Sequence, residues 1–181
     1  GVPAATCGAA AVAIARIEAN EPALNAFIYF DADALRADAI AADAVRASGA
    51  SVGPLHGLPI IIKDSFDVAG LPTTAGTPAL ATNVPGINGA AVQRLFDAGA
   101  ILVGKANLHE LSSGGTTNNA FTGATHNPYA LSRVPGGSSG GNGAALAARF
   151  APFALGEDTG GSGRGPCALS GCVGFRPTTG R

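Results

Sequence analysis

Two clusters of glycine and serine are the residues of this chain best suited to covalent chemistry. The first is Gly136–Gly141, with Ser138 and Ser139, and the second is Asp158–Gly163, with Ser162. A serine flanked by glycines has an accessible hydroxyl, and glycine allows neighbouring backbone amides to turn toward a bound group. This pattern indicates a serine nucleophile that attacks a carbonyl group.

A serine nucleophile requires a base, and Lys63 is the candidate that the sequence offers. None of the three histidines lies in a zinc-protease or nucleophile-elbow motif. Lys63 follows the apolar run Ile60–Ile62, and burial there would lower the pKa of its amine from the model-compound value of about 10.4. A hydroxyl from Ser138 or Ser139 could carry the proton between Ser162 and Lys63, and the residues alone do not separate these two serines.

The second cluster also supplies donors for an oxyanion, the negative oxygen that forms when a carbonyl is attacked. The predicted donors are the backbone amides of Thr159, Gly160, Gly161 and Ser162. Removing one such donor from other enzymes costs roughly 10²–10³ in rate. Arg164 is expected either to orient this loop or to pair with a carboxylate such as Asp158, in a structural rather than catalytic role.

The elements that must position these residues alternate between strand and helix. Helical patterns cover 8–20, 31–47, 89–98 and 140–149, and strand patterns cover 60–63, 101–103 and 153–156. Asp31 is expected to cap the second helix, and Ser48-Gly49 to end it. This rhythm predicts an α/β fold with buried, parallel strands.

The candidate residues fall at the places where α/β proteins bind ligands. Lys63 ends a predicted strand, Ser138 and Ser139 precede a predicted helix, and Ser162 follows the strand at 153–156. Ligands of such sheets lie at the carboxyl ends of strands and at helix N-termini. The long irregular stretch 112–138 is also expected to be functional, because a loop of this length is uncommon inside a compact domain.

The composition excludes several classes of protein. The chain has 46% hydrophobic and 13% charged residues, with 11 basic against 12 acidic residues in no run or stripe, so we expect neither nucleic-acid nor membrane binding. The three cysteines fit neither a disulfide framework nor a paired zinc motif, which favours the reducing cytoplasm. No cofactor or metal is expected. Because the chain contains no methionine, we expect its natural start to lie upstream.

Four segments together resemble the amidase signature family: Gly57–Asp64, Pro135–Gly141, Gly156–Ser162 and Gly171–Arg181. The resemblance implies a mixed, largely parallel sheet covered by helices, and a Ser–cis-Ser–Lys triad that hydrolyses amides through an acyl-enzyme. On this basis Ser162 is the nucleophile, Ser138 the bridging serine beside a cis peptide bond, and Lys63 the base. Ser139 is then a supporting hydrogen-bonding residue.

The chain departs from the family pattern at several positions. Gly163 and Gly165 replace two aliphatic residues after the nucleophile, and Glu157 stands where the family usually has a small or hydroxyl residue. The chain is also shorter than the family's enzymes. Residues 1–181 are therefore expected to be the N-terminal catalytic portion of a single domain that a C-terminal segment completes, and a homodimer is left open.

Three functions are weighed. The segments 71–80, 117–121 and 126–129 are similar to the indoleacetamide and mandelamide hydrolases, which implies a small arylalkyl amide substrate. The alternatives are a glutaminase subunit of a tRNA-dependent amidotransferase, and a non-catalytic α/β fragment whose glycine loops bind an anion. Lys105 lacks the remainder of a phosphate-loop motif, so we expect it to be a surface lysine.

Overall fold

A computed structural model describes residues 5–180 of the chain. Its helices are α1 (Ala5–Leu24), α2 (Ala32–Ala47), α3 (Ala90–Asp97), α4 (Gly140–Ala147) and α5 (Arg164–Leu169). Its strands are β1 (Phe27–Phe30), β2 (Pro59–Lys63), β3 (Ile101–Ala106) and β4 (Phe153–Leu155), and single 3-10 turns span Pro78–Leu80 and Glu110–Ser112. Arg181, the last residue of the fourth motif, lies outside the described residues.

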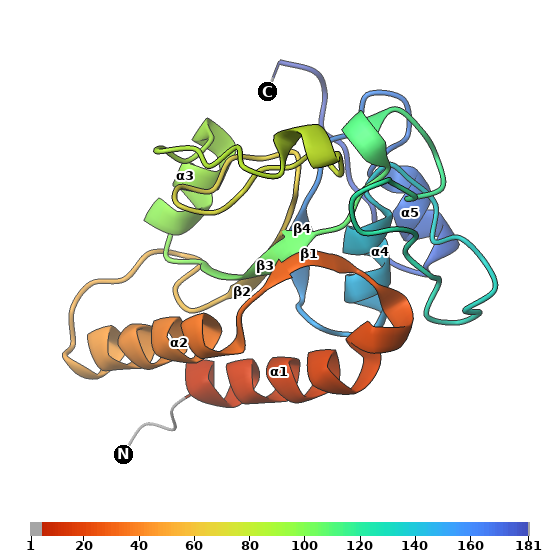
Figure 1. Ribbon diagram of the computed structural model, residues 1–181. Helices are drawn as coiled ribbons and strands as arrows, with labels where there is room; N and C mark the ends of the chain where they lie inside the picture. The colour runs from red at the N-terminus through yellow and green to blue at the C-terminus, as the bar shows by residue number, and fades with distance from the viewer. Residues whose placement is uncertain (1–4, 181) are drawn as a thin grey trace.

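The strands form one mixed sheet in the order β1-β3-β2-β4 (Figure 1). β2 is parallel to both of its neighbours, with Lys63 opposite Ala106 of β3 and Ile62 opposite Leu155 of β4, whereas β1 is antiparallel to β3. Every residue of β2 is buried, as its uninterrupted apolar run predicts for a central parallel strand. The expected α/β fold with a largely parallel sheet is therefore confirmed.

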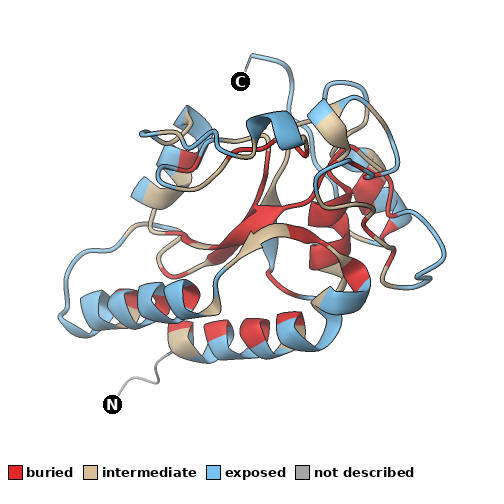
Figure 2. Ribbon diagram, in the orientation of Figure 1, coloured by how far each residue is buried: buried red, intermediate tan, exposed pale blue. Residues whose placement is uncertain are grey.

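Apolar cores lie on both faces of the sheet, whose central part is buried (Figure 2). Successive residues of β2 belong to different cores. Ile61 belongs to the core that includes Ala144 of α4 and the buried side of α1. Ile62 belongs to the other core, together with Val92 of α3. Because side chains alternate along a strand, Lys63 lies on the same face as Ile61, beside α4.

The helix α2 begins and ends where the sequence indicates. The Asp31 carboxylate accepts hydrogen bonds from the amides of Asp33 and Ala34, both at 2.9 Å, and its charge is favourable at a helix N-terminus. Ser48 is the C-cap, and Gly49 follows with a φ of +76°, a conformation that glycine adopts at little cost.

The sequence indicates neither β1 nor α5. The four residues of β1 are too few to show a strand period. Helix α5 contains Gly165 and Pro166, which are poor helix formers, so propensity predicts a loop there. Pro166 is tolerated because it lies in the first turn, where the missing N–H has no partner within the helix.

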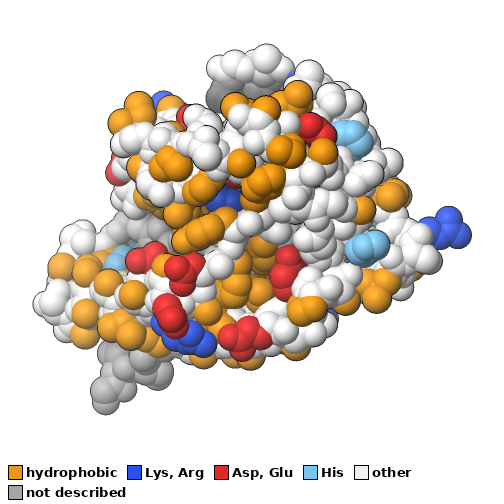
Figure 3. Space-filling model, viewed as in Figure 1, with side chains coloured by type: hydrophobic (Ala, Val, Ile, Leu, Met, Phe, Trp, Pro, Cys, Tyr) orange, Lys and Arg blue, Asp and Glu red, His pale blue; other side chains and the backbone are white. Residues whose placement is uncertain are grey.

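The surface carries no gathered positive charge on the face drawn in Figure 3, where Lys and Arg side chains are few and separate. From residue 5 to residue 180, no helix combines the length and the apolar character that crossing a bilayer requires.

Candidate active site

Lys63 and Ser138 meet inside the protein. Lys63 ends β2 with a side chain that is 0% exposed, and Ser138 is 0% exposed as well. The Lys63 Nζ donates a hydrogen bond to the Ser138 Oγ at 2.6 Å. It also forms an ion pair with the carboxylate of Glu157 in the loop after β4. Two residues that the sequence proposes as base and proton carrier are therefore in direct contact.

The loop that carries Ser138 is held closely by its neighbours. The Gly137–Ser138 peptide bond is cis, as the family resemblance implies. A Cβ atom at Gly137 would lie 2.7 Å from the carbonyl carbon of Gly115, which leaves room for glycine alone. The Ser138 carbonyl accepts a hydrogen bond from the amide of His109 at 2.9 Å, and Ser139 is the N-cap of α4. These contacts fix the Ser138 backbone beside the lysine.

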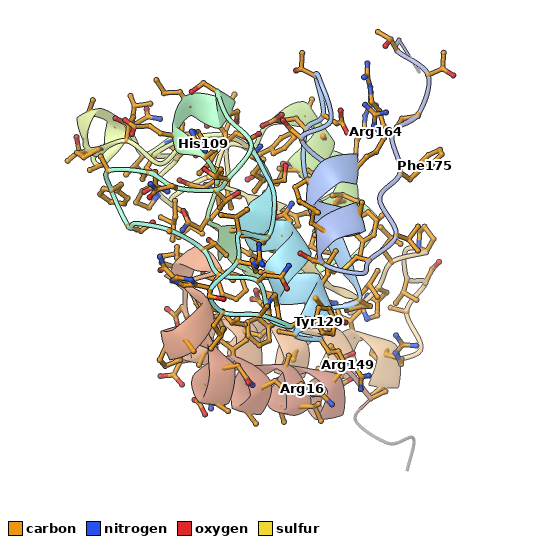
Figure 4. The ribbon with its side chains drawn as sticks, turned by 90° about the vertical axis from the view of Figure 1, so that its right-hand side faces the viewer. Arg16, His109, Tyr129, Arg149, Arg164 and Phe175 are labelled. Atoms are coloured by element: carbon orange, nitrogen blue, oxygen red, sulfur yellow. The ribbon has the colours of Figure 1, made fainter. Side chains whose placement is uncertain are left out.

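Asp158 organises the loop that carries Ser162. Its carboxylate accepts hydrogen bonds from the backbone amides of Gly161, Gly163 and Arg164, at 2.7, 3.1 and 3.0 Å. The guanidinium of Arg164, at the start of α5, donates to both carboxylate oxygens at 2.9 and 3.1 Å (Figure 4). These bonds, first of all those from the Arg164 side chain, hold the pKa of Asp158 well below its usual range.

Ser162 is partly exposed and lies next to the first cluster. Its carbonyl accepts a hydrogen bond from the Ser139 amide at 3.1 Å, which ties the two serine loops together. The Ser138 hydroxyl is bonded to the Lys63 amine, whereas the Ser162 hydroxyl forms no hydrogen bond within residues 5–180.

One of the four proposed oxyanion donors already has a partner. The Gly161 amide donates to a carboxylate, and Gly161 has a φ of +121°, which only glycine adopts readily. The amides of Thr159, Gly160 and Ser162 donate no hydrogen bond within residues 5–180. These three amides are the ones available to a ligand in this conformation.

The protonation of Lys63 depends on two opposed effects. Burial lowers the pKa of its amine, because the charged form loses its hydration. The hydrogen bond and the charge of Glu157, together with the charge of Asp158, act in the opposite direction, and the net effect is a lowered pKa. The environment thus moves Lys63 toward the neutral form that a general base requires.

Two features of the site were not anticipated from the sequence. Glu157 is noted there only as a departure from the family, and Ser112, whose Oγ donates to the Glu157 Oε1 at 2.6 Å, is not singled out at all. These residues are 45 positions apart, and no spacing rule joins a loop serine to a distant glutamate.

The prediction of a surface position for Lys105 is wrong. Its side chain is 0% exposed, and its Nζ lies 2.6 Å from the Oδ1 of Asp64, which is buried too. The same Nζ donates to the carbonyl of Pro72 at 2.9 Å, and Asp64 also accepts from the hydroxyl of Thr74 at 2.5 Å. A buried pair of opposite charges is stable only with such additional bonds, and here it holds the 72–74 loop against β2 and β3.

In the part of the chain that the structure describes, His, Cys, Asp and Glu form no group of three that could hold a metal ion.

Comparison with known proteins agrees with this geometry. A protein-family model described as Amidase matches residues 9–181. The chain is 48% identical over 165 residues to a glutamyl-tRNA(Gln) amidotransferase subunit from Acidothermus cellulolyticus, and the match covers 91% of this chain and 33% of that protein.

Two solved structures share the fold. The native peptide amidase of Stenotrophomonas maltophilia is 39% identical with a TM-score of 0.90, and the match covers 97% of this chain and 37% of that one. A bacterial aryl acylamidase of the amidase signature family is 35% identical with a TM-score of 0.91, over the same shares of the two chains. The chain therefore belongs to the amidase signature family, and it spans about a third of the length of the curated relative.

Proposed function

We propose that the protein of which this chain is a part hydrolyses the C–N bond of a carboxylic amide through an acyl-enzyme on Ser162. The observation that carries the proposal is the buried hydrogen bond of 2.6 Å between the Lys63 Nζ and the Ser138 Oγ. A fully buried lysine amine bonded to a serine hydroxyl is the arrangement that a base with an intervening proton carrier requires.

In the proposed reaction the Ser162 Oγ attacks the amide carbonyl carbon while its proton passes through Ser138 to neutral Lys63. The carbonyl oxygen gains negative charge and is stabilised by the amides of Thr159, Gly160 and Ser162. The C–N bond then breaks, the leaving nitrogen takes the proton back through Ser138, and water later releases the acid by the same route.

The test is a pair of substitutions in the complete polypeptide. Ser162→Ala removes the nucleophile and Lys63→Ala the base, so each is expected to lower kcat by roughly 10⁴-fold or more. Ser132→Ala, at an exposed serine outside both clusters, is the matched control and should retain activity. Release of ammonia from an amide measures turnover, and circular dichroism checks that each variant is folded.

A fluorophosphonate probe gives a second readout that does not require the natural substrate. It should label Ser162 in the unmodified protein and leave Ser162→Ala unlabelled. Undiminished hydrolysis in either alanine variant would contradict the proposed triad.

Two substrate classes have separate support. A small arylalkyl amide is supported by the similarity of segments 71–80, 117–121 and 126–129 to the indoleacetamide and mandelamide hydrolases. A glutaminase role that supplies ammonia to partner subunits is supported by the relatives named as glutamyl-tRNA(Gln) amidotransferase subunits, including one from Chloroflexus aurantiacus at 51% identity. Hydrolysis of indoleacetamide without a partner favours the first class. Glutamine hydrolysis that rises with partner subunits and tRNA favours the second.

The proposal extends to the whole molecule. We propose that residues 1–181 are the N-terminal portion of a single catalytic domain, because the amidase that shares their fold is matched over only 37% of its length. A cytoplasmic location and a small-molecule substrate complete the proposal.

A further inference from the structure

Glu157 is the one acidic side chain bonded to the amine of Lys63 within the described part of the chain. The Lys63 side chain is 0% exposed, and the side chain of Glu157, its bonded partner, is 31% exposed. The Ser112 Oγ donates to the same carboxylate oxygen at 2.6 Å and fixes its position. Ser112, Glu157, Lys63 and Ser138 therefore form one continuous hydrogen-bonded chain.

We propose that Glu157 is a positioning residue that sets the pH at which Lys63 becomes an effective base. The inference rests on the function proposed above. A carboxylate bonded to an ammonium stabilises the charged form of the amine, so Lys63 must lose a proton before it can accept one from Ser138. The protein should then hydrolyse amides more slowly at neutral pH than at alkaline pH.

The other charged groups around Lys63 are already paired. Asp158 is bound by the guanidinium of Arg164 at 2.9 Å, and Asp64, the residue after Lys63, pairs with Lys105 at 2.6 Å. Helix α4, which packs on β2, has no charged residue between Gly140 and Ala147.

The segment after β3 offers no competing charge. The Nδ1 of His109 lies 3.2 Å from the Thr116 Oγ1, and the Glu110 carboxylate accepts from the amide of Ala120 at 3.3 Å, so both side chains are engaged elsewhere. Glu157 is therefore the group whose removal changes the electrostatics at the Lys63 amine most directly.

The test compares Glu157→Gln with the unmodified protein in the complete polypeptide. Glutamine keeps an oxygen that can accept from Lys63 and Ser112 but removes the charge. In protein labelled with ¹³C at lysine, the side-chain resonance that is missing from the spectrum of Lys63→Arg is assigned to Lys63. The midpoint of the Lys63 titration should fall by about one pH unit or more in Glu157→Gln, since an opposite charge in contact shifts a pKa by about 1–3 units.

The pH dependence of the activity is an independent measure of the pH at which Lys63 loses its proton. The rising limb of kcat/KM against pH should move to lower pH in Glu157→Gln by the same amount as the NMR midpoint, so the rate near neutral pH increases. Glu110→Gln is the matched control, because it removes a carboxylate that makes no contact with Lys63, and it should change neither the Lys63 midpoint nor the position of the limb. Ser112→Ala keeps the charge and should leave the Lys63 midpoint within a few tenths of a unit.

The outcomes separate this inference from the proposed function. An unchanged Lys63 midpoint in Glu157→Gln overturns the role of Glu157, whether or not the protein hydrolyses amides. A loss of activity at every pH with no displacement of the limb also overturns it and assigns Glu157 a purely structural role. A shifted midpoint in a protein that hydrolyses no amide supports the effect of Glu157 on Lys63 and rejects the proposed reaction instead.

Discussion

At the scale of single residues, Asp158 stabilises the loop that carries Ser162 through backbone amides as well as through its ion pair with Arg164. Its side chain is 7% exposed and accepts from three backbone amides, while the side chain of its partner Arg164 is 52% exposed. Hydrogen bonds to a buried carboxylate are strong, whereas an exposed ion pair contributes little. The two residues of one salt bridge are thus expected to contribute unequally.

We predict that Asp158→Ala lowers the free energy of unfolding by about 2–3 kcal/mol, because three amides lose their acceptor. Arg164→Ala should cost clearly less than Asp158→Ala, since the carboxylate keeps its bonds to those amides. Urea denaturation of both variants measures the difference. Equal losses would mean that the guanidinium, and not the backbone contacts, carries the stabilisation.

The sequence indicates which residues could take part in the site, but not all of the residues to which their side chains are bonded. The proximity of Lys63 and Ser138 was expected because both lie at ends of elements that an α/β sheet brings together. The contact of Glu157 with Lys63 was not expected, because it depends on which way one side chain turns after β4. The prediction for Lys105 fails for a different reason. Its partner Asp64 is 41 residues away, and only the register of β2 and β3 makes the two residues neighbours.

At the scale of elements, α5 is a short helix that carries a glycine with space around it. A Cβ atom at Gly165 would meet only the Gly137 carbonyl oxygen, at an ordinary distance of 3.8 Å. Glycine inside a helix is less favourable than alanine by about 0.5–1 kcal/mol. Steric exclusion of a Cβ atom therefore does not explain why glycine stands here in place of the family's aliphatic residue.

We predict that Gly165→Ala raises the free energy of unfolding by about 0.5–1 kcal/mol. Gly137→Ala is the contrasting variant, since its Cβ would lie 2.7–2.8 Å from the backbone of residues 114–116, and it should destabilise by about 2 kcal/mol or more. Thermal unfolding of the two proteins compares them. Destabilisation by Gly165→Ala would show that α5 lies closer to its surroundings than the structure has it.

The elements show why part of the fold was predictable. Residues 60–63 and 101–103 were predictable as strands because short, continuous aliphatic runs rich in Ile and Val are typical of buried strands. The antiparallel strand β1 joins the sheet through pairing with β3, which no local pattern encodes. Tertiary contact likewise makes α5 a helix against its own low propensity.

At the scale of the whole molecule, the chain exposes large apolar side chains beyond α5. Val173 is 92% and Phe175 85% exposed, although the backbone at Gly174 packs against Cys167 and Arg164 of α5 (Figure 4). β4, with Phe153 at 44% exposure, lies at one edge of the sheet. An exposed apolar segment and an exposed edge strand are both kinds of surface that another part of a protein covers. This agrees with the proposal that residues 1–181 are one portion of a catalytic domain.

If that proposal holds, Phe175 is buried in the complete polypeptide, and Phe175→Asp should lower its free energy of unfolding by about 2 kcal/mol or more, because the lost burial of an aromatic side chain is compounded by an unpaired charge. Ile87→Asp is the matched control. Ile87 is 80% exposed in the loop before α3, and nothing in the proposal covers it, so its replacement should change the stability by less than about 0.5 kcal/mol. Chemical denaturation of both variants of the complete polypeptide makes the comparison. Small and equal effects would show that Phe175 stays in water, and the apolar surface beyond α5 would then need a separate protein as its partner.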